Sequence, residues 1–154
     1  MRYLLLLVVL FSFASVRAQK VDVDDGLVTV DGTPYCKLVK KDCKLGLCDF
    51  SVQTLDGTEI AFIKWREYND KDKQMQSNPN GRVLFYDWTF LGTGAKCETD
   101  QISAKNVAKI LVDGPLMKDG VLNPDGEKKI VLVNGMRHSE RMKVLNATII
   151  IIQN

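Results

Sequence analysis

The sequence has 154 residues, of which 45% are hydrophobic, and a formal net charge of +2. Arg2 and Arg17 lie in an apolar leader and account for that excess, so the remainder of the chain is formally neutral. A neutral chain lacks the general electrostatic attraction on which proteins that bind nucleic acids or anionic membranes rely, which argues against both partners. The remaining length suits one domain with its own core.

Residues 1–18 have the order of a secretory signal peptide. A basic residue, Arg2, precedes an apolar run over residues 4–13, and small side chains follow toward Ala18. A membrane-spanning helix needs roughly 20 apolar residues, about twice the length of this run. We therefore expect cleavage after Ala18 and a single secreted globular domain over residues 19–154. The leader is compatible with bacterial export to the periplasm and with eukaryotic secretion.

The four cysteines all follow this leader and form an even set in an oxidising compartment, which favours two disulfides. We predict the pairs Cys43–Cys48, across a short loop, and Cys36–Cys97, with free or partly paired thiols as the alternative. The spacings match no common zinc-ligand knuckle and include no CxxC redox motif, so we predict no metal site.

The first half of the chain has the pattern of a β-meander. Asp31 with Gly32, and Asp56 with Gly57, each separate two runs rich in β-branched and aromatic residues, as hairpin turns do. The runs over residues 59–68 and 82–90 alternate in polarity and are expected to form the centre of the core. In the first run, one face carries Ala61, Ile63 and Trp65 and the other carries Ile60 and Phe62, so its start is expected to be buried on both faces. In the second run, Leu84, Tyr86, Trp88 and Phe90 alternate with Val83, Phe85, Asp87 and Thr89.

One helix is predicted over residues 102–114. Ala104, Val107, Ala108 and Leu111 share one helical face, Ser103 can cap its start, and glycine followed by proline can end it. Beyond it, residues 130–135 and 142–152 are rich in isoleucine and valine, and we expect two further strands, the last covered on both sides. The predicted fold is α+β: an antiparallel, meander-rich sheet, either open, doubled into a sandwich or closed into a partial barrel, with one packed helix.

Catalytic motifs are weak. His138, the single histidine, follows an Asn-Gly turn in a charged segment, where we expect an exposed loop residue, and no serine lies in a GxSxG motif. Glu59, Glu67 and Asp87 are the strand carboxylates that could support hydrolysis without histidine. The acidic segment at Asp22, Asp24 and Asp25 departs from the EF-hand pattern and is expected to be solvated, with a looser oxygen-ligated calcium site as the alternative. No cofactor is predicted.

The strongest candidate for a binding site is the polar segment over residues 69–81. It is long for a connection between strands, and such loops are commonly functional or merely mobile. We expect it to bury little and to carry a binding site with the neighbouring aromatic residue. The predicted binding residues are Tyr68, Asp70, Lys71, Asp72 and Lys73.

These observations predict a secreted or periplasmic, non-enzymatic binding module for a protein or carbohydrate ligand. The mature chain is expected neither to bind nucleic acid nor to insert into a membrane. A small hydrolase that uses carboxylates is the first alternative. A structural subunit of a surface assembly is the second.

Overall fold

The computed structural model describes residues 19–152 except 45 and 101, with side chains described as far as residue 146. The predicted signal peptide lies outside the described residues. The long strands are β1 (Val21–Asp24), β2 (Leu27–Val30), β3 (Thr33–Lys44), β4 (Leu47–Gln53), β5 (Glu59–Asn69), β6 (Arg82–Phe90) and β7 (Lys96–Asp100). A 3-10 turn η1 (Lys71–Lys73), the helices α2 (Ala104–Asp113), α3 (Pro124–Asn134) and α4 (Arg137–Ile152), and a hairpin of β8 (Met117–Lys118) and β9 (Val121–Leu122) complete the described chain.

The seven long strands form one antiparallel sheet in which every strand pairs with its neighbours in sequence, in the order β1 to β7. The α+β class and the meander are therefore confirmed. The described sheet is open and does not close into a barrel. Because Ile63 pairs with Trp88, and Lys64 with Asp87, the two pairs point to opposite faces. We call the face with Ile63 and Trp88 the core face, and the face with Lys64 and Asp87 the outer face.

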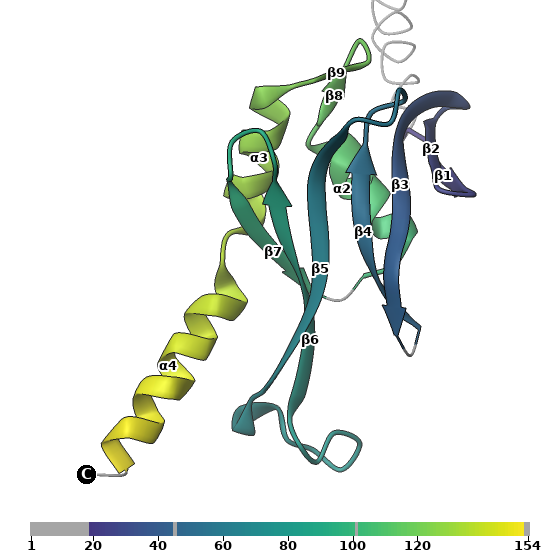
Figure 1. The fold of residues 1–154 in the computed structure, drawn as a ribbon. Coiled ribbons are helices and arrows are strands. Elements are labelled where there is room, and N and C mark those ends of the chain that lie inside the picture. Colours follow the sequence, from purple (N-terminus) through teal and green to yellow (C-terminus); the bar gives the residue numbers. More distant parts are fainter. Residues whose placement is uncertain (1–18, 45, 101, 153–154) are drawn as a thin grey trace, which may run out of the picture.

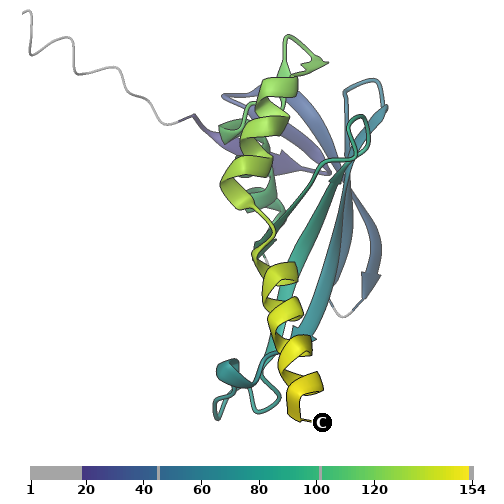
Figure 2. The ribbon, with the colours of Figure 1, turned by 90° about the vertical axis from the view of Figure 1, so that its left-hand side faces the viewer.

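Helix α2 packs on the core face, as its sequence predicts. The Ser103 side chain accepts a hydrogen bond from the Asn106 amide at the helix start, and Gly114 ends the helix. The buried side of the helix joins one hydrophobic cluster with the sheet, which includes Val107, Ala108, Leu111, Val52, Ala61, Ile63, Trp88 and Phe90. Figures 1 and 2 show α2 and α3 together on this side of the sheet.

Helix α3 replaces the strand expected over residues 130–135, and that prediction is wrong. Asn123 caps the helix by accepting from the Asp125 amide, and Pro124 occupies its first turn. Gly126 allows close packing, since a Cβ there would lie 2.1 Å from the Pro115 carbonyl oxygen. Ile130 is buried, whereas the Val133 side of the helix is exposed. The buried residues Glu127 and Ile130 are three positions apart, a spacing that places them on one face of a helix.

Helix α4 replaces the predicted last strand, residues 142–152, so that prediction is also wrong. The Glu98 carboxylate, on β7, accepts hydrogen bonds from the backbone amides of His138 and Ser139 at 2.7 and 3.0 Å. A carboxylate at this end neutralises the unpaired amides and the positive end of the helix dipole. The helix therefore depends on a cap that is distant in sequence. No helix within the described residues is both long and apolar enough to cross a membrane.

The chain passes from one face of the sheet to the other between α3 and α4. The Glu98 amide, at the edge of β7, donates to the Gly135 carbonyl at 2.8 Å as the chain rounds this edge. His138, one turn later, stacks on Phe85, which shares the outer face with Arg66 and Asp100. The first turns of α4 therefore lie on the outer face.

The predicted Cys43–Cys48 disulfide is confirmed. The predicted Cys36–Cys97 disulfide is wrong, because both of these thiols are free and buried. Cys36 lies on β3 and Cys97 on β7, four strand spacings apart in the sheet order. At about 4.8 Å per spacing that separation, measured along the sheet, far exceeds the roughly 7 Å between Cα atoms that a disulfide spans.

Candidate functional site

Two acidic residues of the loop predicted to bind a ligand make structural contacts with α4. Asp70 is 2% exposed, and its carboxylate receives two hydrogen bonds from the Arg141 guanidinium of α4, at 2.7 and 2.8 Å. The same guanidinium also bonds to Asp72. Lys71 and Lys73 are exposed. The acidic residues of the predicted site are therefore used to hold α4, and the expectation that this loop buries little is wrong at Asp70.

Tyr68, the aromatic member of the predicted site, also faces α4. Its ring packs edge-on against Phe85 and His138, and its hydroxyl lies 3.4 Å from His138 Nδ1. His138 is 6% exposed, which contradicts the expected exposed loop position. Its Nε2 lies 3.2 Å from Asp100 Oδ1, although the geometry does not make a hydrogen bond. Burial lowers the pKa of His138, opposed by the nearby Asp100 carboxylate.

The three strand carboxylates considered for hydrolysis do not converge. Glu59 accepts a hydrogen bond from Ser51, and Glu67 pairs with Arg82 at the far end of β5. Asp87 lies on the outer face, opposite Glu98 in the register. Glu98 is 1% exposed, and α4 occupies both of its oxygens.

The outer face holds the arrangement that we regard as the candidate site, the outer-face groove. Strands β5, β6 and β7 build it beside the start of α4, and its volume is about 380 Å³. In Figure 1 the viewer looks onto this face, with α2 behind the sheet. The residues that line the groove are Phe62, Lys64, Arg66, Asp87, Thr89, Leu91 and Lys96.

The groove combines three cations with one carboxylate. The Lys64 ammonium lies 5.0 Å from the centre of the Phe62 ring, a cation–π contact that directs this flexible side chain across the face. Arg66 Nε lies 3.9 Å from Asp87 Oδ2, beyond hydrogen-bond range. Asp87 Oδ1 is buried and has no hydrogen-bond partner in the described structure.

The protonation of Asp87 reflects this environment. Its side chain is 24% exposed, and burial raises the pKa of its carboxyl, while Lys96 and Arg66 act in the opposite direction. A buried acceptor without a donor is costly for the free protein. The exposed part of the same carboxyl is what a ligand in the groove can reach.

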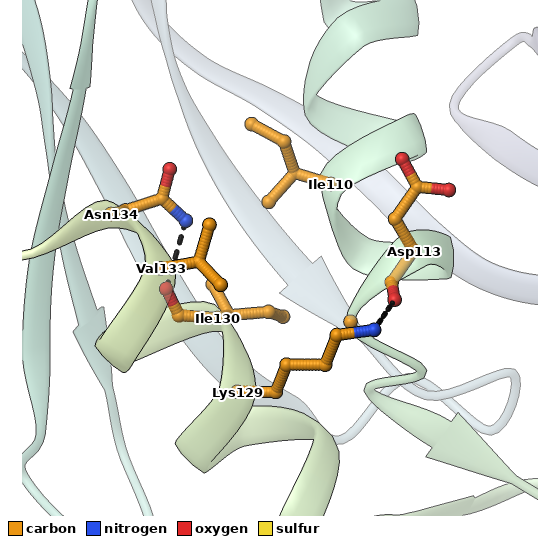
Figure 3. Close-up of a pocket in the computed structure, with 7 residues that line it drawn as sticks. Ile110, Asp113, Lys129, Ile130, Val133 and Asn134 are labelled. Carbon is orange, nitrogen blue, oxygen red and sulfur yellow. Dashed lines mark hydrogen bonds between the residues drawn. The ribbon is translucent and has the colours of Figure 1, made fainter.

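Two other hollows fit a ligand less well. Figure 3 shows a pocket of about 170 Å³ between α2 and α3, in which Lys129 bonds to the Asp113 carbonyl and Asn134 to the Ile130 carbonyl. This volume is below the range of about 300–1,000 Å³ typical of ligand sites. A larger groove, about 670 Å³, lies at the start of α2, but there Ser103 caps the helix and Lys105 pairs with Asp22.

Metal binding has no support in the described part of the chain, where no three His, Cys, Asp or Glu side chains are grouped to hold an ion. Asp22, the first residue of the acidic segment, pairs with Lys20 and Lys105. These two lysines lower the pKa of its carboxyl.

The sequence contained part of the signal for the outer-face groove. The alternation in residues 59–68 separates Lys64 and Arg66 from the core residues, and Asp87 was already a candidate carboxylate. Lys96 could not be added from the sequence, because its place on the same face depends on the pairing of Thr89 with Lys96. Comparisons with protein-family models, with curated proteins and with solved structures found no match for this chain.

Proposed function

We propose that this protein is a secreted or periplasmic, non-enzymatic binding module whose ligand is anionic and binds in the outer-face groove. The observation that carries the proposal is the gathering of Lys64, Arg66 and Lys96 around one carboxylate, in a groove of the outer face that is lined by residues of the sheet and its turns and by none of the described helices. Charge-assisted hydrogen bonds from such cations are about twice as strong as neutral ones.

The compartment is supported by two independent features. The first eighteen residues have the order of a signal peptide. The Cys43–Cys48 disulfide belongs to an oxidising environment.

The non-enzymatic part of the proposal is supported by the state of the carboxylates. A hydrolase of the two-carboxylate type needs both groups free to reach the substrate. Glu98, the carboxylate opposite Asp87, is committed to the start of α4.

Binding to a sulfated polymer tests the anionic ligand. We expect the protein to bind immobilised dextran sulfate at low ionic strength and to elute as the NaCl concentration rises, because salt screens exposed charges. The triple variant Lys64→Glu, Arg66→Glu, Lys96→Glu should lose this retention.

The matched control is Lys71→Glu, Lys73→Glu, Lys128→Glu, which reverses the same number of exposed cations away from the groove. It should elute close to the wild type, and thermal unfolding should show that both triple variants are folded. Equal losses in the two variants, or a greater loss in the control, would overturn the groove as the binding site. A loss confined to the control would return the site to the loop over residues 69–81.

A further inference from the structure

The chemistry of the groove narrows the ligand beyond its charge. Three cations favour a ligand with negative groups, but Asp87 places a fourth, opposite charge among them. The Asp87 side chain is 24% exposed, so a ligand in the groove meets its carboxyl, and a ligand that supplies acceptors alone cannot pair with it. The ligand that complements the whole groove therefore carries hydroxyl or amine donors as well as anionic groups.

The spacing of the cations favours an extended ligand over one small ion. Lys64 and Arg66 are two residues apart on β5, so their Cα atoms are about 7 Å apart. Lys96 lies on β7, two strands from β5, or about 10 Å across the sheet. These separations spread the three charges along and across the sheet, so a polymer with repeated charges matches them better than one phosphate or sulfate does.

Apolar atoms border the same groove. Leu91 is 49% exposed and Phe62 is half-buried, and both line the groove. A sugar ring presents C–H groups on its face and hydroxyl donors at its rim. Because Asp87 and Leu91 are four residues apart, about 13 Å along an extended chain, one ring of a polymer can cover Leu91 while a hydroxyl of another ring reaches Asp87. Thr89 adds a hydroxyl that can both donate and accept.

We infer that the ligand is an acidic polysaccharide of the uronate class, in which each ring carries a carboxylate for the cations and hydroxyls for Asp87. This inference rests on the proposed anionic ligand of the same groove. An acidic polypeptide supplies the carboxylates on flexible side chains, and its amide donors have no fixed relation to them.

The test compares polygalacturonate with poly-glutamate of matched chain charge, using isothermal titration calorimetry at low salt. We expect the wild type to bind polygalacturonate at least about tenfold more tightly, the effect expected of one hydrogen bond to a charged acceptor. Asp87→Leu removes the acceptor and the negative charge together. It should weaken binding to polygalacturonate by about tenfold and leave binding to poly-glutamate unchanged or stronger.

Asp87→Asn serves as a second variant of unchanged shape, and it should also strengthen binding to poly-glutamate because it removes a repelling charge. Asp113→Leu, at an exposed carboxylate on α2 outside the groove, is the matched control and should leave the preference for polygalacturonate over poly-glutamate unchanged. If poly-glutamate binds as tightly as polygalacturonate, or if Asp87→Leu strengthens binding to both, the uronate inference is wrong while the anionic ligand stands. If neither polymer nor dextran sulfate binds, the proposed function itself fails.

Discussion

The guanidinium of Arg141 holds the buried carboxylate of Asp70 in a two-point contact, from Nε to Oδ2 at 2.7 Å and from Nη2 to Oδ1 at 2.8 Å. The Asp70 amide also donates to the Gly81 carbonyl at 2.8 Å, which closes the base of the loop. One residue therefore fixes both the loop and the second turn of α4. Together with the Glu98 cap, this contact docks α4 at two points one helical turn apart.

Removing the charge of Asp70 should therefore destabilise the fold. Asp70→Asn leaves Arg141 with a weaker partner, and we expect the Tm to fall by more than about 4 °C. Arg141 holds the pKa of Asp70 below its ordinary 3.8, so this contribution is complete at neutral pH and is lost as the pH falls below that value. Glu67→Gln, which breaks the exposed pair with Arg82, is the control and should lower the Tm by less than about 2 °C. Equal shifts in the two variants would show that the Asp70 contact contributes no more than a surface ion pair.

Two variants with a shortened loop distinguish the contribution of Asp70, which anchors the loop to α4, from that of the other loop residues. Replacing residues 71–80 with Gly-Asn retains Asp70 and Gly81, whose backbones already pair, and should change the stability by no more than about 1–2 kcal/mol. Replacing residues 70–80 also removes the anchor and should cost clearly more. Chemical denaturation with circular dichroism measures both. Indistinguishable midpoints would contradict the assignment of Asp70 as the anchor.

The lowered pKa of His138 predicts how the stability of the fold depends on pH. Burial lowers its pKa below 6.5, so folding favours the neutral ring. The unfolded chain then binds more protons between the two pKa values, and stability is complete above about 6.5 and declines as the pH falls toward the folded value. The charged groups that face the ring are Asp100, Glu98 and Arg137, and Tyr68 is its neutral neighbour.

His138→Phe retains the stacking on Phe85 and cannot titrate. As the pH falls from 7 to 5, the Tm of the wild type should fall by more than the Tm of this variant. Ser139→Ala, the neighbouring change on α4, should leave the shape of the wild-type pH profile intact. A difference that does not vary with pH would show that His138 does not titrate in this range.

The sequence allowed the sheet and α2 to be predicted because their signals are local. Hairpin turns such as Asp56 with Gly57 determine where strands begin, and the 3.6-residue period of Val107, Ala108 and Leu111 determines the buried side of the helix. Helices α3 and α4 escaped prediction because runs of valine and isoleucine do not distinguish a strand from a helix by period. The cap of α4 comes from Glu98, forty residues from His138 in the sequence, and no local rule detects it.

The candidate site shows the same limit. The segment after Tyr68 is polar and long, which the sequence alone shows, but its partner Arg141 lies on a segment whose pattern predicts a strand. Without that helix, Asp70 and Asp72 have no visible structural role and are taken for binding residues. The cations of the outer-face groove come from two strands that are not neighbours, so their convergence depends on the register of β6 with both.

The last prediction concerns the two thiols that the structure leaves free. Cys36 and Cys97 are fully buried, and burial raises the pKa of each thiol to about 12, so neither forms the reactive thiolate near neutral pH. In the native protein, iodoacetamide should modify neither cysteine. In denaturant without a reductant, mass spectrometry should find two alkylated cysteines, and after reduction four, because the Cys43–Cys48 disulfide then opens. The variant Cys43→Ser, Cys48→Ser is the control, and it should give two alkylations in denaturant with or without reductant. No alkylation of the unreduced, denatured wild type would mean that Cys36 and Cys97 are bridged, which would require β3 and β7 to lie far closer than their places in the sheet allow.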